Sequence, residues 1–414
     1  MRKLLSALLI VSIAASAITF SACGQKNTNT TSSKTPDTSA ARVSRPSRVS
    51  EEPIEVSVDE KKPRMTEAQL ADLNKKVTDC QGIPSFTCTS EKLDGRKISK
   101  DLTVSLICDN SSSPFQEDLI RNFVRTADRI GFKHIITAET DGTASTINDA
   151  LTQAVKDKPN MVMLSGNINK DTVVTNIELA QANGIEVVSA GTTGCEQPDH
   201  FVDYTVPIPY ENAGALMADW GIVKTKGKVN ALVVNCTDSE LSQTIFRGFK
   251  KEFEQYVSAD DGNCTVINAN AIELGNGLTN KIKTILENDR KINYIFVFDD
   301  AAITDAVSSV VQTSSSAKIV ATGGKPEDFN YAQSGSIDML VAHSYEWTAY
   351  AMVDYILRIA GGLKLPEQQD VPFRVLTKDI INKAIDDSDE SFDTFDEICF
   401  GSNFVTGYNN LWNY

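Results

Sequence analysis

Short apolar runs alternate with helical patterns along residues 102–191, and this alternation constrains the fold more than any other feature of the chain. The runs that are typical of buried strands span residues 102–107, 134–139, 161–165 and 185–191. The first helical pattern between them begins at Pro114, which suits an initial helical turn, and ends at Gly131. Strands this short and apolar are covered by helices on both faces, so the segment predicts a parallel sheet.

The same alternation starts again beyond residue 212. Further strand-like runs span residues 229–235, 264–269, 294–298, 318–322, 338–343 and 373–377. We therefore expect an α/β protein with two doubly wound, Rossmann-like parallel-sheet lobes. Sheets of this kind place their sites at the carboxyl ends of the strands, so two lobes that face each other across a hinge would form a cleft able to close on a small molecule.

The N-terminus has the pattern of an exported lipoprotein. A basic start is followed by the uncharged residues 4–20, a run that is short for a membrane span of roughly 20 residues. Phe20-Ser21-Ala22-Cys23 resembles a bacterial lipobox, although Leu is usual where Phe20 stands. We expect residues 1–23 to be a lipoprotein signal peptide, with lipid on Cys23 as the membrane anchor. An ordinary secretory signal with a chance cysteine is the alternative.

Residues 24–100 are expected to form a flexible spacer with one short helix. The first part is rich in Ser, Thr, Asn and Pro and carries scarcely an apolar cluster, so it cannot bury enough surface to fold. Thr66-Glu67-Ala68-Gln69 has the capping-box pattern that begins a helix. Cys80 and Cys88 are candidates for a disulfide in an exported protein, and the sequence leaves open whether they are joined.

Composition and motifs argue against several functional classes. The formal net charge of −15 disfavours nucleic acid and anionic lipid surfaces as partners. No Ser-His-Asp set or carboxylate pair stands at interpretable spacing, and no C-x-x-C pair occurs, so neither an enzyme, a cofactor nor a metal site is expected. The acidic run 386–397 lacks the glycine of an EF-hand loop and is expected to be a solvated tail.

Five short segments of the sequence resemble local sequence patterns of one protein family. They are SSSPFQEDLIRNFVRTADRIGF (111–132), NGIEVVSAG (183–191), FRGFKKEF (246–253), YIFVFDDAAITDAV (294–307) and KIVATGGKPEDF (318–329). With the order of elements, they resemble the periplasmic-binding-protein type I superfamily, in particular the ribose-binding-protein-like solute receptors of sugar ABC importers. The resemblance covers residues 101–377.

The resemblance implies two lobes joined by a three-segment hinge near residues 205, 343 and 373. The N-lobe would hold residues 101–205 plus 344–372. The C-lobe would hold residues 206–343 plus 373–414, including an acidic C-terminal extension. We expect the aromatic cluster of residues 400–414 to pack on the C-lobe. Repressors that share the fold carry an N-terminal DNA-binding helix-turn-helix and no export signal, so the resemblance favours a receptor.

In the N-lobe, the resemblance implies five ligand-binding positions. Ser113 is the polar residue before proline, and Phe115 stacks on an apolar ligand face or serves as a core residue. Ser165, or the glycine after it, stands where Asn is often found. Gly191 and Thr192 replace the Asp and Arg that grip sugar hydroxyls in the family. This loss of charged groups is the largest departure from the family pattern.

In the C-lobe, the resemblance implies further positions. Gln243 falls near the usual ligand-binding Arg, Asp299 falls where Asn is common, and Asp300 follows in the expected place. Gly323 stands where a second Asp is usual. His343 falls near the Gln of the second crossing, where it tunes binding with pH or serves the hinge. Phe298, Tyr345 and Trp347 are additional candidates for stacking surfaces.

The resemblance implies a lipid-anchored solute-binding protein of an ABC importer on the extracytoplasmic face of a bacterial membrane. We expect a monomer that captures a small polar solute, a sugar or sugar-like compound, and delivers it to the permease subunits without catalysis. One alternative is a ligand-sensing subunit for a chemotaxis or histidine-kinase partner. Another is a lobe pair that binds protein or cell wall and has lost its solute.

Overall fold

The computed structural model describes residues 56–59, 62–190, 200–275, 277–324, 326–366, 371–387 and 392–414. Contacts divide the chain into Met1–Glu51 and Glu52–Tyr414, and all elements below belong to the second unit. Cys23, Gly191 and Thr192 lie outside the described residues, so the lipobox and two of the expected ligand positions stay predictions.

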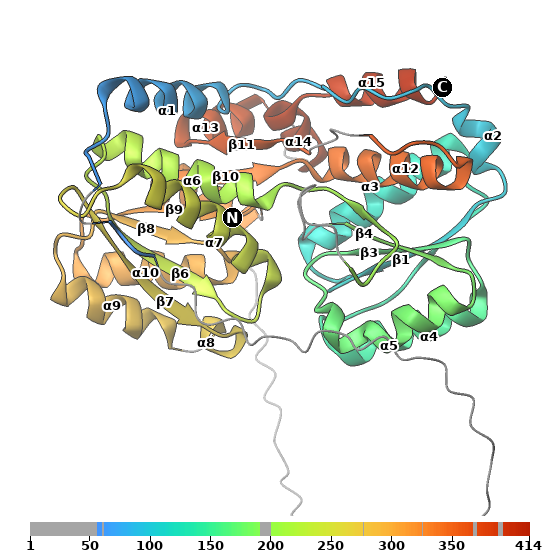
Figure 1. The fold of residues 1–414 in the computed structure, drawn as a ribbon, viewed down its shortest axis with the longest axis horizontal. Helices are drawn as coiled ribbons and strands as arrows, with labels where there is room; N and C mark the ends of the chain where they lie inside the picture. The colour runs from blue at the N-terminus through green and yellow to red at the C-terminus, as the bar shows by residue number, and fades with distance from the viewer. Residues whose placement is uncertain are drawn as a thin grey trace, which may run out of the picture. The chain divides into compact units, whose positions relative to one another are not determined.

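The first sheet has five parallel strands in the order β2-β1-β3-β4-β5. They are β1 Thr103–Cys108, β2 His134–Thr137, β3 Met161–Ser165, β4 Glu186–Ala190 and β5 Tyr204–Val206. Its helices are α3 Pro114–Ile130, α4 Ala144–Asp157, α5 Lys170–Ala182 and α12 Tyr345–Gly361. Alternate strand residues face opposite layers: Leu106 joins the cluster that contains α3 and α12, while Ile107 joins that of α4 and α5. Both faces are therefore covered, as the apolar strands require (Figure 1).

The second sheet has six strands in the order β11-β10-β9-β8-β6-β7, of which only the β10–β11 pair is antiparallel. They are β6 Asn230–Cys236, β7 Asn263–Ala269, β8 Tyr294–Val297, β9 Lys318–Thr322, β10 Met339–His343 and β11 Phe373–Leu376. One face packs on α6 Tyr210–Thr225 and α7 Glu240–Tyr256. The other packs on elements that include α9 Leu278–Asn288, α10 Ile303–Thr313 and α11 Pro326–Ser334. The short elements α8 Ala271–Gly275 and η1 Asp300–Ala302 lie in the same lobe.

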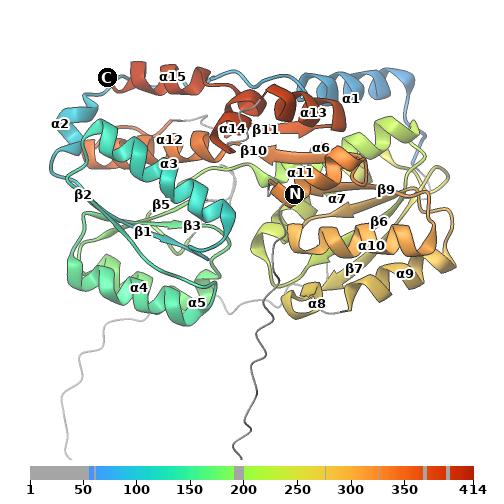
Figure 2. The same ribbon diagram turned by 180° about the vertical axis from the view of Figure 1, so that it is seen from behind.

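The chain passes between the two sheets three times. It crosses from β5 to α6, from β10 to α12 and from α12 to β11. The predicted fold, two doubly wound lobes with a three-segment hinge, is confirmed (Figure 2). Each predicted strand is present with its ends within two residues of the expected ones. The three-residue strand β5 was not predicted, because so short a run carries no readable period.

Both ends of the described chain add helices that the sequence pattern did not resolve in full. They are α1 Glu67–Asp79, α2 Gly95–Ser99, α13 Lys378–Asp387, α14 Phe392–Phe400 and α15 Asn403–Leu411. The capping box is confirmed, because the Thr66 side chain accepts from the Gln69 backbone and the Gln69 side chain accepts from the Thr66 backbone. No helix in the described ranges is long and apolar enough to cross a membrane.

The expected spacer ends before residue 100. Leu73 and Val77 of α1 and Leu93 beyond it are buried in the main core cluster. The candidate disulfide is not formed, since Cys80 and Cys88 are both free thiols. Their surroundings explain this: the Cys80 carbonyl accepts from the β11 backbone, whereas Cys88 lies beside the buried charges of α12. The two cysteines are therefore held on different lobes.

The C-terminus also differs from expectation. Phe404 and Trp412 of the aromatic cluster stack on Trp347 and Tyr350 of α12 in the N-lobe. Phe400 joins the core of the C-lobe, so the cluster packs on both lobes and not on the C-lobe alone. The four-residue spacing of its aromatic side chains predicts one helical face but not the partner of that face. In the acidic run, Asp396 is buried and its carboxylate accepts from the Ser344 hydroxyl at 2.7 Å. That residue is thus part of the packed structure and not of a solvated tail.

Candidate functional site

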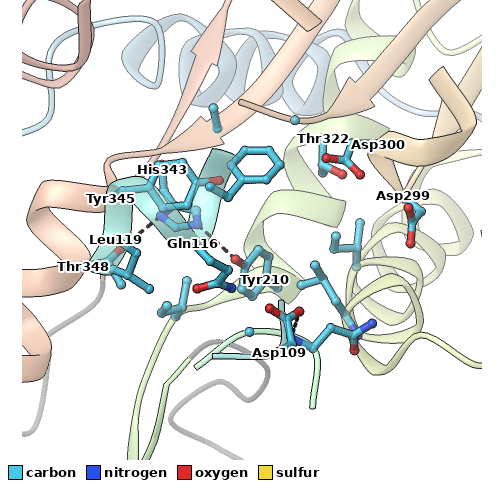
Figure 3. Close-up of a pocket in the computed structure, with 18 of the residues that line it drawn as sticks. Asp109, Gln116, Leu119, Tyr210, Asp299, Asp300, Thr322, His343, Tyr345 and Thr348 are labelled. Carbon is cyan, nitrogen blue, oxygen red and sulfur yellow. Dashed lines mark hydrogen bonds between the residues drawn. The ribbon is translucent and has the colours of Figure 1, made fainter. Parts of the chain in front are cut away.

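A cavity of about 330 Å³ lies between the two lobes, at the carboxyl ends of their strands (Figure 3). Its walls come from the segments after β1 and β3 in the N-lobe, from those after β8 and β9 in the C-lobe, and from the crossings. This is where two facing open sheets are expected to hold a ligand. The side chains that line it supply carboxylates, amides, hydroxyls and aromatic rings.

The N-lobe wall is built around Asp109, which directly follows β1. Its carboxylate accepts from the backbone of Asn110 at 2.7 Å and of Asn167 at 2.9 Å, and from the Gln116 side chain. Burial raises the pKa of Asp109, while these hydrogen bonds oppose the shift. The Gln116 side chain is 8% exposed, and its Oε1 atom has no hydrogen-bond donor among the described residues. This wall therefore offers a fixed acceptor to a ligand.

The C-lobe wall carries Asp299 and Asp300 after β8. Asp299 accepts from the Ala301 backbone at 3.1 Å, which fixes the start of η1. After β9, Gly323 stands where the family pattern has an aspartate, and the carboxylate of Asp328 lies beside it. A Cβ at position 323 would overlap the Asp328 carboxylate. This carboxylate accepts from the Gly324 backbone at 3.0 Å. Glycine at 323 thus leaves room for an acid that comes from α11.

Two aromatic rings of the N-lobe reach across to the C-lobe. The Phe115 and Tyr345 rings are tilted by 49° with centroids 5.2 Å apart. A Cβ placed on Gly324 would lie 3.1 Å from Phe115 Cε1 and 3.5 Å from the Tyr345 hydroxyl. The rings therefore close one side of the cavity against the opposite lobe.

Each of the three crossings places a ring residue at the cavity. Tyr210 follows the first crossing, His343 and Tyr345 flank the second, and Phe373 follows the third. The His343 centroid lies 5.7 Å from that of Tyr210, 5.1 Å from that of Tyr345 and 5.3 Å from that of Phe373. We name these four residues the hinge cluster. Because its members come from three different crossings, their packing depends on the angle between the lobes.

The hydrogen bonds of His343 assign its tautomer. The Thr348 hydroxyl donates to the Ser344 carbonyl at 2.8 Å. The Thr348 hydroxyl oxygen therefore accepts from His343 Nδ1, at 3.1 Å. His343 Nε2 then accepts from the Tyr210 hydroxyl at 3.0 Å. Burial lowers the pKa of His343 to about 4, so the ring is neutral at pH 7.

The lobes also meet directly at the start of α7. The Asn167 amide donates to the Ser239 hydroxyl at 3.0 Å, and its oxygen lies 3.5 Å from the Leu241 backbone nitrogen. Ser239 is itself the N-cap of α7. Asn167 of the N-lobe therefore adds to the capping of a C-lobe helix, which links one cavity wall to the other.

Six of the nine expected ligand residues line the cavity: Ser113, Phe115, Ser165, Asp299, Gly323 and His343. Ser113 also caps α3, accepting from the Gln116 backbone at 3.3 Å. Gln243 is not among the lining residues, because its amide donates to the Cys236 carbonyl at 3.1 Å. Of the candidate stacking residues, Phe298 and Tyr345 line the cavity, whereas Trp347 stacks on Phe404 instead.

Sequence reasoning missed Asp109, Gln116, Asn167 and Tyr210 as lining residues. Asp109 and Asn167 follow β1 and β3 closely, so the rule that sites lie at the carboxyl ends of strands could have found them. No signal in the sequence distinguished Gln116 and Tyr210 from other residues at the start of a helix.

The charged side chains among the described lining residues of the cavity are acidic. Its described lining residues include Asp109, Asp299 and Asp300 but neither Lys nor Arg. Within the described ranges, no group of three or more His, Cys, Asp or Glu side chains could hold a metal ion. The wall can therefore accept hydrogen bonds from hydroxyl or amino groups, whereas it offers no cation to an anionic ligand.

The family model described as a periplasmic binding protein domain matches residues 104–364. Among solved structures, a glucose-galactose binding protein from Geobacillus stearothermophilus is 18% identical, with a TM-score of 0.58 over 67% of this chain and 98% of its own. Two ABC transporter solute-binding proteins from Agrobacterium vitis are similar. The one with bound allitol is 12% identical (TM-score 0.59, 70% and 100% covered), and the one with α-D-tagatopyranose is 17% identical (TM-score 0.58, 71% and 99% covered). No curated protein matches the chain.

Proposed function

Because the chain belongs to the periplasmic binding protein domain family, we propose that it captures a small, neutral, polyhydroxylated solute between its lobes. Sugars and sugar-like polyols are the compounds of this class. The proposal concerns binding: the described cavity walls supply hydrogen-bonding groups and aromatic rings.

The observation that carries the proposal is the acceptor atom of Gln116. A buried amide oxygen without a donor among the described residues costs about 1–3 kcal/mol, and a ligand hydroxyl that reaches it when the lobes close would remove that cost. The neighbouring Asp109 carboxylate has its two oxygens fixed by backbone donors. Preorganised acceptors of this kind favour a ligand that donates several hydrogen bonds at once.

The aromatic rings and the carboxylates of the cavity walls narrow the class of solute further. The Phe115 and Tyr345 rings can cover the apolar C–H face of a sugar, while Asp299 and Asp300 stand in the opposite wall. The described lining residues include three aspartates and neither Lys nor Arg, which disfavours a carboxylated or phosphorylated sugar. The ligands bound in two of the similar solved structures, allitol and α-D-tagatopyranose, are uncharged polyhydroxylated compounds, which supports the same choice.

Capture would serve import. A cleft that closes on its solute presents a changed lobe surface to membrane permease subunits of an ABC transporter, and closure is a population shift that the ligand drives. Lipid on Cys23 would hold the protein at the extracytoplasmic face of the membrane, within reach of the permease. The lipobox pattern of Phe20-Ser21-Ala22-Cys23 supports this part of the proposal.

A thermal-unfolding panel tests the choice of solute. The chain from residue 24 onward is heated with glucose, galactose, tagatose, allitol or myo-inositol, and in parallel with glucuronate and glucose 6-phosphate. A neutral ligand at 100 times its Kd adds about 2.7 kcal/mol of stability, which shifts the midpoint by several degrees. The anionic sugars should give no shift. Equal shifts with the anionic sugars, or none with any neutral polyol, would contradict the proposal.

Two matched variants test whether the ligand-induced thermal shift arises in the cavity. Gln116→Leu removes the buried acceptor and should abolish the shift. Gln243→Leu changes the same residue type outside the cavity lining and should keep it. Loss of the shift in both variants would point to a general effect on folding.

A further inference from the structure

The chain is longer than the fold it shares with its relatives. The family match spans residues 104–364, and the solved neighbours align along nearly their whole length with only about two thirds of this chain. We call residues 62–102 the N-terminal extension and residues 378–387 and 392–414 the C-terminal extension. In Figure 1 both run along the edge that carries β10, β11 and α12, which is the side of the crossings.

The N-terminal extension is fixed to both lobes. On the C-lobe, Lys76 Nζ lies 2.7 Å from Asp219 Oδ2 and 2.9 Å from Glu252 Oε1, and the Cys80 carbonyl accepts from the β11 backbone at 2.9 Å. On the N-lobe, the Ser99 hydroxyl donates to the Ile130 carbonyl at the end of α3 at 2.9 Å. The segment between these points therefore spans the gap between the lobes.

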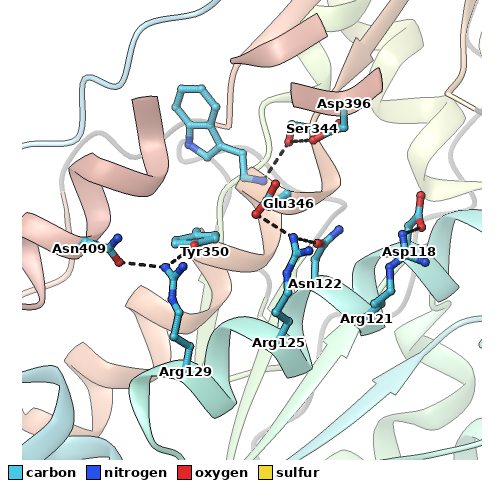
Figure 4. Close-up of polar contacts among 11 residues, drawn as sticks. Asp118, Arg121, Asn122, Arg125, Arg129, Ser344, Glu346, Tyr350, Asp396 and Asn409 are labelled. Carbon is cyan, nitrogen blue, oxygen red and sulfur yellow. Dashed lines mark hydrogen bonds and ion pairs between the residues drawn. The ribbon is translucent and has the colours of Figure 1, made fainter. Parts of the chain in front are cut away.

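The C-terminal extension spans the same gap in parallel. Its helix α13 packs on α11 of the C-lobe. Asp396 of α14 accepts from Ser344 at the second crossing, and Asn409 of α15 accepts from Arg129 of α3 at 3.0 Å (Figure 4). The Phe404 ring stacks on Trp347 of α12 with centroids 4.7 Å apart. Both extensions therefore contact both lobes.

The two extensions are joined beside α12 of the N-lobe. The Phe86 backbone donates to Asn403 Oδ1 at 2.7 Å, and the Asn403 amide donates to the Pro84 carbonyl at 2.8 Å. The Phe86 ring lies against Gly407, where an added Cβ would overlap the ring. It also makes an edge contact with Tyr408 at 4.8 Å. This junction makes the two extensions one unit.

A buried ion pair shows that this unit belongs to the folded protein. Asp354 and Arg358 of α12 are fully buried and paired at 2.8 Å. Arg358 also donates to the Glu91 carbonyl of the N-terminal extension at 3.0 Å, and Asp354 accepts from the Trp412 indole of the C-terminal extension at 2.8 Å. Because a buried pair needs such additional partners, α12 depends on both extensions.

We propose that the two extensions together form a brace that restrains opening of the lobes. Three crossings alone allow hinge rotation about a few residues. Two further connections, joined to each other and fixed on both lobes, must break contacts or slide when the lobes rotate. The brace therefore favours a narrow range of lobe angles even without ligand, and this holds whichever solute the cavity takes.

Pulsed electron paramagnetic resonance tests the brace in the unliganded chain. Genetically encoded spin-label residues replace the exposed Lys156 on α4 and the exposed Ile272 on α8, which avoids the native cysteines. In Figure 1 both helices lie at the edge of their lobes far from the extensions. The brace predicts one narrow distance distribution.

Two variants weaken the junction. Asn403→Ala removes both hydrogen bonds of an exposed side chain, and Gly407→Val displaces the Phe86 ring. Each should broaden the distribution toward longer distances. Ser402→Ala is the matched control, because this exposed side chain makes no capping hydrogen bond, and it should keep the narrow distribution. Circular dichroism verifies folding, and Asn403→Ala alone carries the test if Gly407→Val does not fold.

A broad distribution in the unaltered chain would overturn the proposal. So would an unchanged narrow distribution in a folded Asn403→Ala variant, because the lobes would then be held by something other than the junction.

Discussion

The His343 ring accepts a hydrogen bond from the Tyr210 hydroxyl at 3.0 Å, although the two residues stand at different crossings between the lobes. Thr348 fixes the acceptor role of Nε2 by accepting from Nδ1. A neutral imidazole is therefore built into the hinge, beside the cavity. Protonation of His343 would turn its acceptor nitrogen into a donor that faces the Tyr210 hydroxyl.

Stability should fall between pH 6.5 and pH 4. Burial lowers the pKa of His343 from 6.5 to about 4, so within this range the unfolded chain binds a proton that the folded chain does not. The free energy of unfolding then decreases as the pH falls, by up to about 3 kcal/mol from this group. Urea unfolding at pH 7.5 and 4.5 measures the loss, and His343→Gln should reduce it.

The comparison with a variant is needed because other groups titrate in the same range. Burial raises the pKa of Asp109, which works in the opposite direction, but this carboxylate is present in both proteins. His134→Gln, at an exposed position, should keep the full pH dependence. An identical pH dependence in His343→Gln and the unaltered chain would contradict the assignment.

Lys76→Met should destabilise the protein more at pH 8 than at pH 5. Burial raises the pKa of Asp219 to about 7, against the opposing effect of Lys76, so this carboxylate is charged at pH 8 and largely protonated at pH 5. Without Lys76, the charged form is buried without its cation, at a cost of about 1–3 kcal/mol at pH 8. Chemical denaturation at the two pH values measures the difference.

The double variant Lys76→Met with Asp219→Asn should recover most of the loss at pH 8, since the buried charge is then gone. Lys75→Met is the control, because Lys75 pairs with the exposed Asp79 one turn away. Such surface pairs contribute little. A loss in Lys76→Met that is equal at both pH values would rule out the buried carboxylate as its cause.

Trp412→Phe should lower the free energy of unfolding by about 1–3 kcal/mol. The indole is 1% exposed and donates to Asp354, so its loss leaves a buried carboxylate with one donor fewer. Tyr414→Phe, at a position that is 43% exposed, removes a polar group from a neighbouring ring and should have little effect. Equal unfolding energies for the two variants, measured in urea, would argue against this role of the indole.

Phe115→Ala should weaken solute binding about tenfold. The ring lies beside Tyr345 and near Gly324 at one side of the cavity, so its removal exposes the apolar face of a bound sugar, at a cost of about 1–2 kcal/mol. Phe115→Tyr keeps the aromatic face and should retain most of the affinity. The ratio of Kd values reports the effect, and an unchanged affinity in Phe115→Ala would assign the ring to the core of α3.

The framework of the protein was predictable because each strand carries its own signal. Residues 161–164 are all apolar, and every residue of β3 is buried, as a central parallel strand requires. The polar residues at 113, 299 and 343 were found because they follow strands in recognisable local patterns. The cavity residue Asp109 was missed although it obeys the same rule.

The extensions were not predictable, because their contacts are made between residues far apart in the sequence. The aromatic spacing in α15 fixes one face of the helix, but nothing local indicates that this face meets Tyr350. Likewise, the short spacing of Cys80 and Cys88 suggested a bridge, whereas their positions are set by β11 and α12. Tertiary packing decided both outcomes.

Isothermal titration calorimetry with a neutral polyol from the thermal panel tests whether the cavity between the lobes binds the solute. We expect one saturable site per chain in the unaltered protein and in Gln243→Leu, and no measurable heat in a folded Gln116→Leu variant. Saturable binding that survives unchanged in Gln116→Leu would place the solute outside this cavity, and the absence of binding for every neutral polyol would rule out the proposed class of solute.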